Sequence, residues 1–147
     1  MKKFYFRLDS VLGYRRHLEK KAQRDLVNAH NEQARRKKMA KELRNKRDDI
    51  SKECSDETFK GIDVSSYRLY TSFLQSLNQD LERAHTSLKQ GEERVRDQQE
   101  ILERKSIEKK SLEILKELQF KDYRRARERS EQKAVDELVI MRRGQKA

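Results

Sequence analysis

Apolar residues recur through residues 8–54 with the seven-residue spacing of a helix that packs against a second helix. One set of core positions holds Leu8, Arg15, Ala22, Ala29, Arg36, Leu43 and Ile50, and the other holds Val11, Leu18, Asp25, Glu32, Met39 and Lys46. Leu12, Leu26 and Ala40 widen this stripe by one position. Because charged residues interrupt the stripe, the predicted helix depends on packing against a partner for its stability.

A stronger repeat of the same kind runs through residues 64–142. One set of positions holds Tyr67, Leu74, Leu81, Leu88, Val95 and Leu102, and the other begins with Tyr70, Leu77 and Ala84. Past Leu102 we predict a change of register, with one seam at Ile107, Ile114 and Leu118 and a second at Leu112, Leu115, Tyr123 and Ala126. Gly91 occupies a core position, which either a close approach of the helices or a weak point would explain.

The two periodic segments are separated by a break at residues 55–63, SDETFKGID. Gly61 supplies conformational freedom there, and the Asp63 side chain can accept a backbone N–H of the next helix. The pattern predicts an all-α fold, a long antiparallel two-helix coiled-coil hairpin with a longer second helix. We expect a single coiled-coil domain over residues 1–147, with helices at about 8–54 and 64–142.

Composition excludes the other fold classes. Charged residues make up 43% of the chain and apolar residues 33%, with 4 glycines and no proline, which is too few turn formers for a sandwich or barrel. The single cysteine, Cys54, cannot form an internal disulfide. No stretch approaches the roughly 20 apolar residues that span a bilayer, and we interpret the first residues as mature sequence. We therefore predict a cytoplasmic protein without direct membrane insertion.

The sequence shows no constellation of catalytic or metal-binding residues. The glycines are isolated, so there is no phosphate-binding loop. His17, His30 and His85 lack metal-ligand spacing, and although antiparallel folding could bring His30 near His85, a third ligand is missing. Two helices side by side form no pocket that would desolvate a pair of carboxylates. We predict a protein that is not an enzyme and that binds no cofactor or metal.

Charge is unevenly distributed around a formal net charge of +11. Basic residues are concentrated in the runs 34–47 and 121–133, and we expect the first run to pair across the helices with an acidic stretch around Asp80, Glu82, Glu92 and Glu93. A DNA-reading basic zipper would continue directly into a leucine heptad, whereas the first run leads into the predicted break. The runs are therefore interpreted first as solvated helix faces, and contact with phosphate groups stays open as an alternative.

Aromatic residues gather at two places. Tyr67 and Tyr70 fit core positions of the second segment, whereas Phe73 lies one step off the seam and would be exposed unless a partner covers it. At the start of the chain, the run from Phe4 to Phe6 precedes the first core residue. Two alternatives stay open for this run: packing onto the second helix near residues 112–120, or contact with another protein.

The opening FYFRLDSVLGYRRHLEKKAQRDLVNA resembles the N-terminal signature of the FliJ family of flagellar type III export proteins. The matching positions are Phe4, Phe6, Leu8, Val11, Leu12, Arg15, Glu19 and Ala22. The chain length, the hairpin pattern and the segment YRLYTSFLQSLNQDL also fit, so the resemblance covers nearly the whole chain.

This resemblance implies a non-catalytic coiled-coil component of the flagellar export apparatus. Members of the family engage the hexameric export ATPase and its regulator, the cytoplasmic domain of the membrane export gate, and the export chaperones. The expected location is therefore the cytoplasm, at the inner face of the cell membrane through the apparatus. No nucleic-acid partner is expected.

The resemblance and the residue pattern together predict two partner-binding sites. The gate site comprises Tyr70, Phe73 and Leu77, and the next positions of the family pattern fall on Asp80 and Ala84, which depart from it. The site for the ATPase ring comprises Phe4, Phe6, Arg15, Arg124, Arg125 and Arg127. Two other functions stay as alternatives, a stalk of an injectisome-type secretion system and a basic coiled coil that binds nucleic acid.

Overall fold

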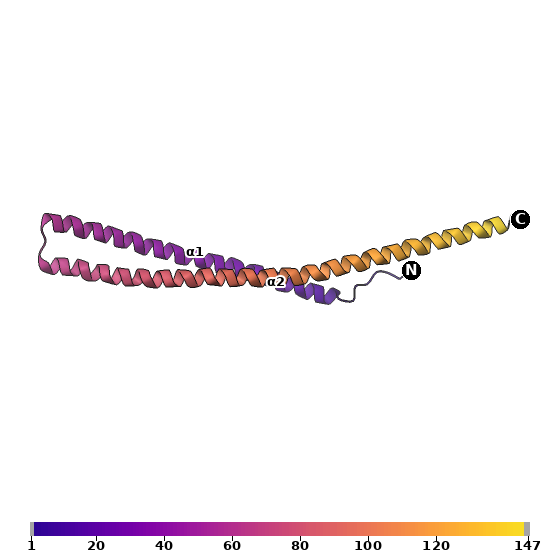
Figure 1. Ribbon diagram of the computed structural model, residues 1–147, viewed down its shortest axis with the longest axis horizontal. Helices are drawn as coiled ribbons and strands as arrows, with labels where there is room; N and C mark the ends of the chain where they lie inside the picture. The colour runs from indigo at the N-terminus through magenta and orange to yellow at the C-terminus, as the bar shows by residue number, and fades with distance from the viewer. Residues whose placement is uncertain (1, 146–147) are drawn as a thin grey trace. The chain divides into compact units, whose positions relative to one another are not determined.

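The computed structural model describes residues 2–145 and shows an all-α helical hairpin (Figure 1). Helix α1 spans Asp9–Lys60 and helix α2 spans Val64–Gly144, and no strand occurs within the described residues. The helices pack against each other, and α2 has 81 residues against 52 in α1. The predicted fold class, with its longer second helix, is confirmed.

The connection between the helices is shorter than the predicted break at residues 55–63, because α1 continues to Lys60. Cys54 is buried and Glu57 half-buried, so the seam of α1 extends into the segment that was expected to be irregular. Gly61 then ends the helix with a φ of 91°, a conformation that favours glycine, and its N–H donates to the Thr58 carbonyl at 3.2 Å.

The start of α2 is capped by Asp63, as the sequence predicts. Its carboxylate accepts hydrogen bonds from the side chain and the backbone N–H of Ser66, and these bonds lower the pKa of Asp63. The Tyr67 N–H donates to the Asp63 carbonyl at 3.2 Å, which begins the helical ladder.

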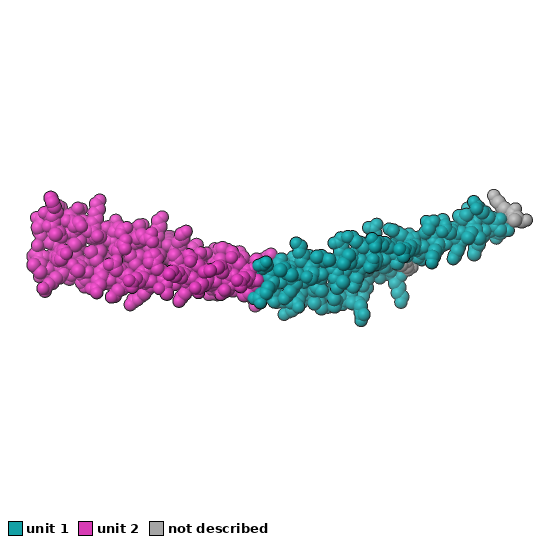
Figure 2. Space-filling view, viewed as in Figure 1, with its two compact units in different colours: residues 1–20, 103–147 teal, residues 21–102 magenta. Residues whose placement is uncertain are grey.

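The hairpin divides into two compact units, which are coloured separately in Figure 2. Unit 1 consists of Met1–Lys20 and Glu103–Ala147, of which residues 2–20 and 103–145 are described, and unit 2 consists of Lys21–Leu102. Each unit contains parts of both helices and is described separately below. That the whole chain acts as a single domain stays a prediction.

Small residues of α1 and larger residues of α2 form the core of unit 2. The buried side chains from α1 are Ala22, Ala29, Ala40 and Cys54, and those from α2 are Leu77, Leu81, Ala84 and Val95. Alanines at a helix interface let two helices approach closely, and the larger leucines of the opposite helix fill the space between them.

The predicted register of α1 is half correct. The set that contains Ala22 and Ala29 faces α2, but the second set lies one residue later than predicted: Ala40 is 4% exposed, whereas Met39 is 55% exposed and Lys46 is exposed. The physical reason is charge. The predicted set would bury Asp25, Glu32 and Lys46, whereas the neighbouring set is largely neutral and costs far less to desolvate.

Gly91 marks a close approach of the helices in unit 2, which decides between the two explanations left open by the sequence. A Cβ atom added at Gly91 would lie 3.7 Å from the Gln33 Cα and 3.3 Å from the Arg36 Cδ. The Arg36 side chain reaches from α1 to α2 at this point, and its Nη1 donates to the Ser87 carbonyl at 2.8 Å. Glycine therefore makes room for an arginine within the seam.

In unit 1, α2 keeps the register of unit 2. Of the two seams predicted past Leu102, the one at Ile107, Ile114 and Leu118 is therefore wrong, whereas Leu112 and Tyr123 of the other are half-buried. The half-buried residues continue the same repeat at Lys105, Lys109, Leu112 and Lys116, whereas Ile107, Ile114 and Leu118 are exposed. Lysine is tolerated in this seam because its aliphatic stem packs between the helices while its ammonium group reaches carboxylates. The Lys109 and Lys116 ammonium groups bond Glu19 and Asp9 of α1.

Candidate partner-binding surfaces

The three residues predicted for the gate site occupy different environments in unit 2. Phe73 is 41% exposed, and its ring lies 5.4 Å from the Lys46 Nζ, measured to the ring centroid. Tyr70 is half-buried and donates its hydroxyl to the Glu53 Oε1 at 3.2 Å; burial and the Glu53 carboxylate raise the pKa of its phenol. Leu77 is 3% exposed.

The side chain of Leu77 belongs to the core and is covered by the hairpin itself, as its predicted core position implies, while the gate site as a whole stays a prediction. Leu77 lies at a seam position four residues after Phe73, and the heptad repeat directs it toward α1. Of the predicted trio, Phe73 offers the largest apolar surface to another protein.

A groove lies beside Phe73 in unit 2, and the sequence did not predict it. It has a volume of about 590 Å³ and is lined by Met39, Glu42, Leu43 and Lys46 of α1 and by Asp80, Arg83, Ala84 and Ser87 of α2. Because Lys46 both lines the groove and lies over the Phe73 ring, the two features are continuous. Asp80 and Ala84, which depart from the family pattern, belong to this groove.

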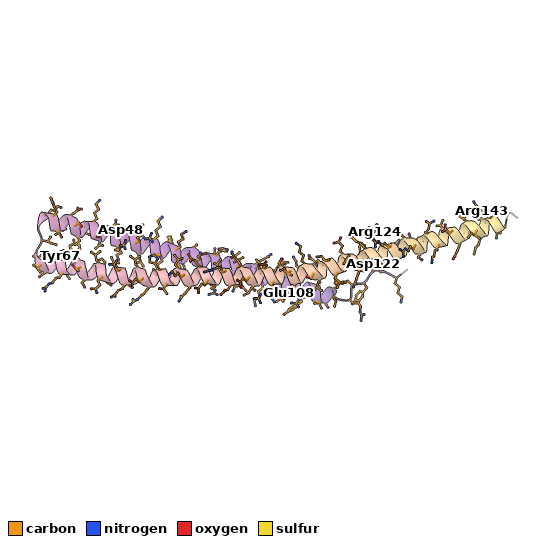
Figure 3. All side chains as sticks on the ribbon, in the orientation of Figure 1. Asp48, Tyr67, Glu108, Asp122, Arg124 and Arg143 are labelled. Carbon is orange, nitrogen blue, oxygen red and sulfur yellow. The ribbon has the colours of Figure 1, made fainter. Side chains whose placement is uncertain are left out.

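Exposed apolar residues also gather around the hairpin turn, where Figure 3 labels Tyr67. Phe59 is 95% exposed, and Val64, Tyr67 and Leu69 are exposed as well. The heptad repeat places Tyr67 in the core, but Tyr67 lies in the first turn of α2 and is 48% exposed. The sequence analysis did not single out Phe59, because it lies inside the predicted break. The feature that could have indicated an exposed site there is a single aromatic residue among polar neighbours.

In unit 1, the aromatic residues of the N-terminal segment pack onto α2. The Phe4 ring meets Phe120 edge-to-face at a centroid distance of 5.2 Å and lies 5.6 Å from Tyr123. The Tyr123 hydroxyl donates to the Lys2 carbonyl at 2.9 Å. Phe6 is buried, whereas Tyr5 is exposed. Of the two alternatives for this run, packing onto α2 is confirmed for Phe4 and Phe6.

Ion pairs join the two helices of unit 1. The closest are Arg15 Nη1 to Glu108 Oε2 and Lys116 Nζ to Asp9 Oδ1, both at 2.6 Å. Hydrogen bonding and attraction from the Lys116 ammonium lower the pKa of Asp9. Arg15, which the resemblance assigns to the ATPase site, is thus held within the hairpin.

The basic run at residues 34–47 pairs differently from the sequence expectation. The ion pairs found among residues 21–102 join neighbours on one helix, such as Arg35 and Arg36 with Glu32. These two guanidinium groups lower the pKa of Glu32 to about 2. Pairing across the helices with the acidic stretch is therefore not observed in this part of the chain, and the carboxylates that Arg35, Arg36 and Arg47 do reach lie within one turn on α1 itself.

The last part of α2 is exposed along its whole described length, from residue 124 to residue 145. Arg124, Arg125 and Arg127 each pair with an acidic residue one turn away, at distances of 3.7, 3.8 and 2.7 Å. Figure 3 labels Arg124 and Arg143 on this segment. It also carries exposed apolar side chains, namely Val135, Leu138, Val139, Ile140 and Met141. An amphipathic helix of this kind within unit 1 is suited to packing against another protein.

The described residues contain no cluster of three or more histidine, cysteine or acidic side chains that could hold a metal ion. Neither helix includes a stretch, within residues 2–145, that is long and apolar enough to cross a membrane. The candidate sites are helix faces with exposed aromatic, aliphatic and basic side chains. Such surfaces are typical of coiled-coil proteins that bind other proteins.

The family model for the flagellar FliJ protein matches residues 3–147, which is essentially the whole chain. The chain therefore belongs to the FliJ family, whose members are non-catalytic components of the flagellar export apparatus. Comparison with curated proteins and with solved structures finds no match.

Proposed function

We propose that this chain is an adaptor without a catalytic reaction of its own, which connects the hexameric export ATPase to the cytoplasmic domain of the export gate. It would do so in the cytoplasm, at the inner face of the membrane, and would also meet the ATPase regulator and the export chaperones. The observation that carries the proposal is that units 1 and 2 expose separate surfaces suited to protein partners.

The proposed ATPase surface is residues 124–145 of α2. This segment combines exposed arginines with an apolar stripe, and it makes few contacts with α1 because every described side chain in it is exposed. A basic helix is attracted to an acidic ring, and attraction between opposite charges speeds association. Phe4 and Phe6 support this surface from the N-terminal segment through their packing on α2.

Charge reversal tests the ATPase contact. We expect the triple variant Arg124→Glu, Arg125→Glu and Arg127→Glu to bind the purified ATPase at least about tenfold more weakly, since three favourable contacts become repulsive. The matched control reverses Lys37, Lys38 and Lys41, three exposed lysines of unit 2, with the same change in net charge. Equal weakening in both variants would show a non-specific effect of charge and would contradict the assignment.

The proposed gate surface is Phe73 together with the neighbouring groove. Full burial of a phenylalanine side chain contributes about 1.5–3 kcal/mol, and because the Phe73 side chain is 41% exposed, a partner can gain about 1 kcal/mol from covering the rest. We therefore expect Phe73→Ala to weaken binding of the gate's cytoplasmic domain about fivefold while the helical circular dichroism signal is kept.

Val64→Ala is the matched control for the gate contact, because Val64 is an exposed apolar residue on the same helix, nine residues earlier and about 180° around the helix from Phe73. Isothermal titration with the purified gate domain measures both variants. Unchanged binding by Phe73→Ala, or an equal loss in Val64→Ala, would remove Phe73 from the site.

A further inference from the structure

A second apolar stripe lies on α2 in unit 1, on the face opposite the seam. We call it the outer stripe, and it consists of Ile107, Ser111, Ile114 and Leu118. Its three aliphatic side chains are 57%, 54% and 54% exposed. At about 100° per residue the stripe lies on the side of the helix away from Lys105, Lys109, Leu112 and Lys116, which face α1. The hairpin thus leaves the three aliphatic residues of the outer stripe uncovered.

The single polar member of the outer stripe is compatible with burial. The Ser111 hydroxyl donates to the Ile107 carbonyl of its own helix at 2.9 Å. Covering the stripe therefore leaves no unpaired hydroxyl donor behind, and the usual penalty for burying a hydroxyl group is avoided.

Charges of alternating sign flank the outer stripe along one edge. They are Glu103, Lys110, Glu117 and Arg124, spaced seven residues apart, and all four side chains are exposed. Glu103 and Lys110 take part in no ion pair among the described residues, whereas Glu117 and Arg124 pair only with neighbours on α2. This edge is available to a second helix.

We propose that the outer stripe binds the outer stripe of a second copy of this chain in an antiparallel, two-fold symmetric pair. Ile107 of each copy then packs against Leu118 of the other, and Ser111 packs against Ile114. The outer stripe itself differs from the surfaces assigned to the ATPase and the gate, and only the flanking Arg124 is shared with the ATPase surface. The proposal does not depend on the function proposed above.

The flanking charges select the second copy and its direction. In an antiparallel pair, equivalent flanking positions face each other, so Lys110 of each copy meets Glu117 of the other, and Glu103 meets Arg124. All four contacts in the dimer are then between opposite charges. In a parallel pair, the flanking charges of one copy would instead meet residues on the opposite edge of the outer stripe of the other copy. Glu103 would then face Glu108, and Glu117 would face Asp122. Both of those contacts repel.

The same pattern limits the length of the pairing. The layer beyond the stripe would bring Arg104 of one copy against Lys121 of the other, so the apolar contact ends after four layers. A contact of this size buries less surface than a stable dimer needs. We therefore expect a weak dimer that forms only at high protein concentration.

Sedimentation equilibrium of the full chain over a wide concentration range tests the proposal. We expect a monomer–dimer equilibrium in which Lys110→Glu and Glu117→Lys each lower the association constant at least about tenfold, since symmetry makes both Lys110–Glu117 contacts repulsive at once. The double variant recreates the pair with its charges exchanged and should restore most of the association. Circular dichroism checks that all three variants keep the helical signal.

A chain that stays monomeric at every concentration would overturn the proposal, and so would a double variant that associates no better than the single ones. Cross-linking tests the direction, in a Cys54→Ala background. A mixture of the Ile107→Cys and Leu118→Cys chains should be joined by a short thiol cross-linker, whereas neither chain should link to itself. Self-linking of Ile107→Cys would show a parallel pair and would refute the antiparallel register.

Discussion

Replacement of Gly91 by alanine measures how tightly the helices meet at the arginine in the seam. In the interior of a helix, glycine is about 1 kcal/mol less favourable than alanine. The added methyl group would also be buried, which contributes up to about 0.8 kcal/mol. On these terms alone, Gly91→Ala would stabilise the protein by more than 1 kcal/mol.

Contacts of Arg36 with the added methyl group reduce this stabilisation. The new Cβ would lie 3.3 Å from the Arg36 Cδ, which is closer than an ordinary van der Waals contact. Arg36 must then move by a few tenths of an ångström, although its guanidinium group is held by the Ser87 carbonyl at 2.8 Å and by Glu32 at 3.0 Å. A hydrogen bond from a charged group contributes about 1.5–3 kcal/mol, so a weakened bond offsets most of the gain.

We therefore expect Gly91→Ala to change the free energy of unfolding by less than about 0.5 kcal/mol in the natural chain, and to stabilise an Arg36→Ala chain by about 1 kcal/mol. Urea unfolding followed by circular dichroism measures the four proteins of this double-mutant cycle. An equal effect of Gly91→Ala in both backgrounds would show that Arg36 does not restrict the site, and the explanation of the glycine would be wrong.

Three further predictions follow from burial and from the pKa of Glu32. Leu81→Ala should lower the free energy of unfolding by about 2–4 kcal/mol, because Leu81 is buried in unit 2. Met39→Ala should change the free energy of unfolding by less than about 0.5 kcal/mol, because Met39 is exposed. Urea unfolding of both variants checks the register of the seam. Phe4→Ala should make the N-terminal segment more accessible to limited proteolysis, and Tyr5→Ala, which removes an exposed ring, should not. The pKa of Glu32 is depressed from 4.5 to about 2 in the folded chain, so its stabilising effect is present above pH 4.5 and is lost as the pH falls toward 2. A Glu32→Gln chain should accordingly lose less stability over this pH interval in an acid titration, and parallel titration curves would contradict the assignment.

Several features of the fold could be predicted from local sequence alone. The heptads of α2 from Leu74 to Leu102 specify a coiled-coil helix with a defined face, because leucines at this spacing form one continuous stripe. Gly61 and Asp63 mark the turn through their backbone and capping chemistry. The match to the FliJ signature is also local, because its matching positions, beginning with Phe4 and Phe6, lie within one short segment at the start of the chain.

The sites depended on tertiary structure wherever two registers competed. Near Ile107 and Ile114, apolar spacing suggested a seam, yet the structure turns these residues outward and places Lys109 and Lys116 against α1. Carboxylates of α1, such as Glu19, make this arrangement favourable, and a single helix read by itself does not reveal what the opposite helix offers.

The amino-acid sequence by itself determined that this chain forms two long helices, at which residue α2 begins after the turn, and to which family the chain belongs. These properties depend on residues that lie close together along the chain. Only the tertiary structure decided that Ala40 of α1 is buried while Met39 is exposed, that Ile107 and Ile114 of α2 face outward, and why a glycine lies opposite Arg36. These properties depend on contacts between side chains of different helices. The chain adopts the register whose contacts together have the lower free energy, and the sequence of one helix alone does not reveal which register that is.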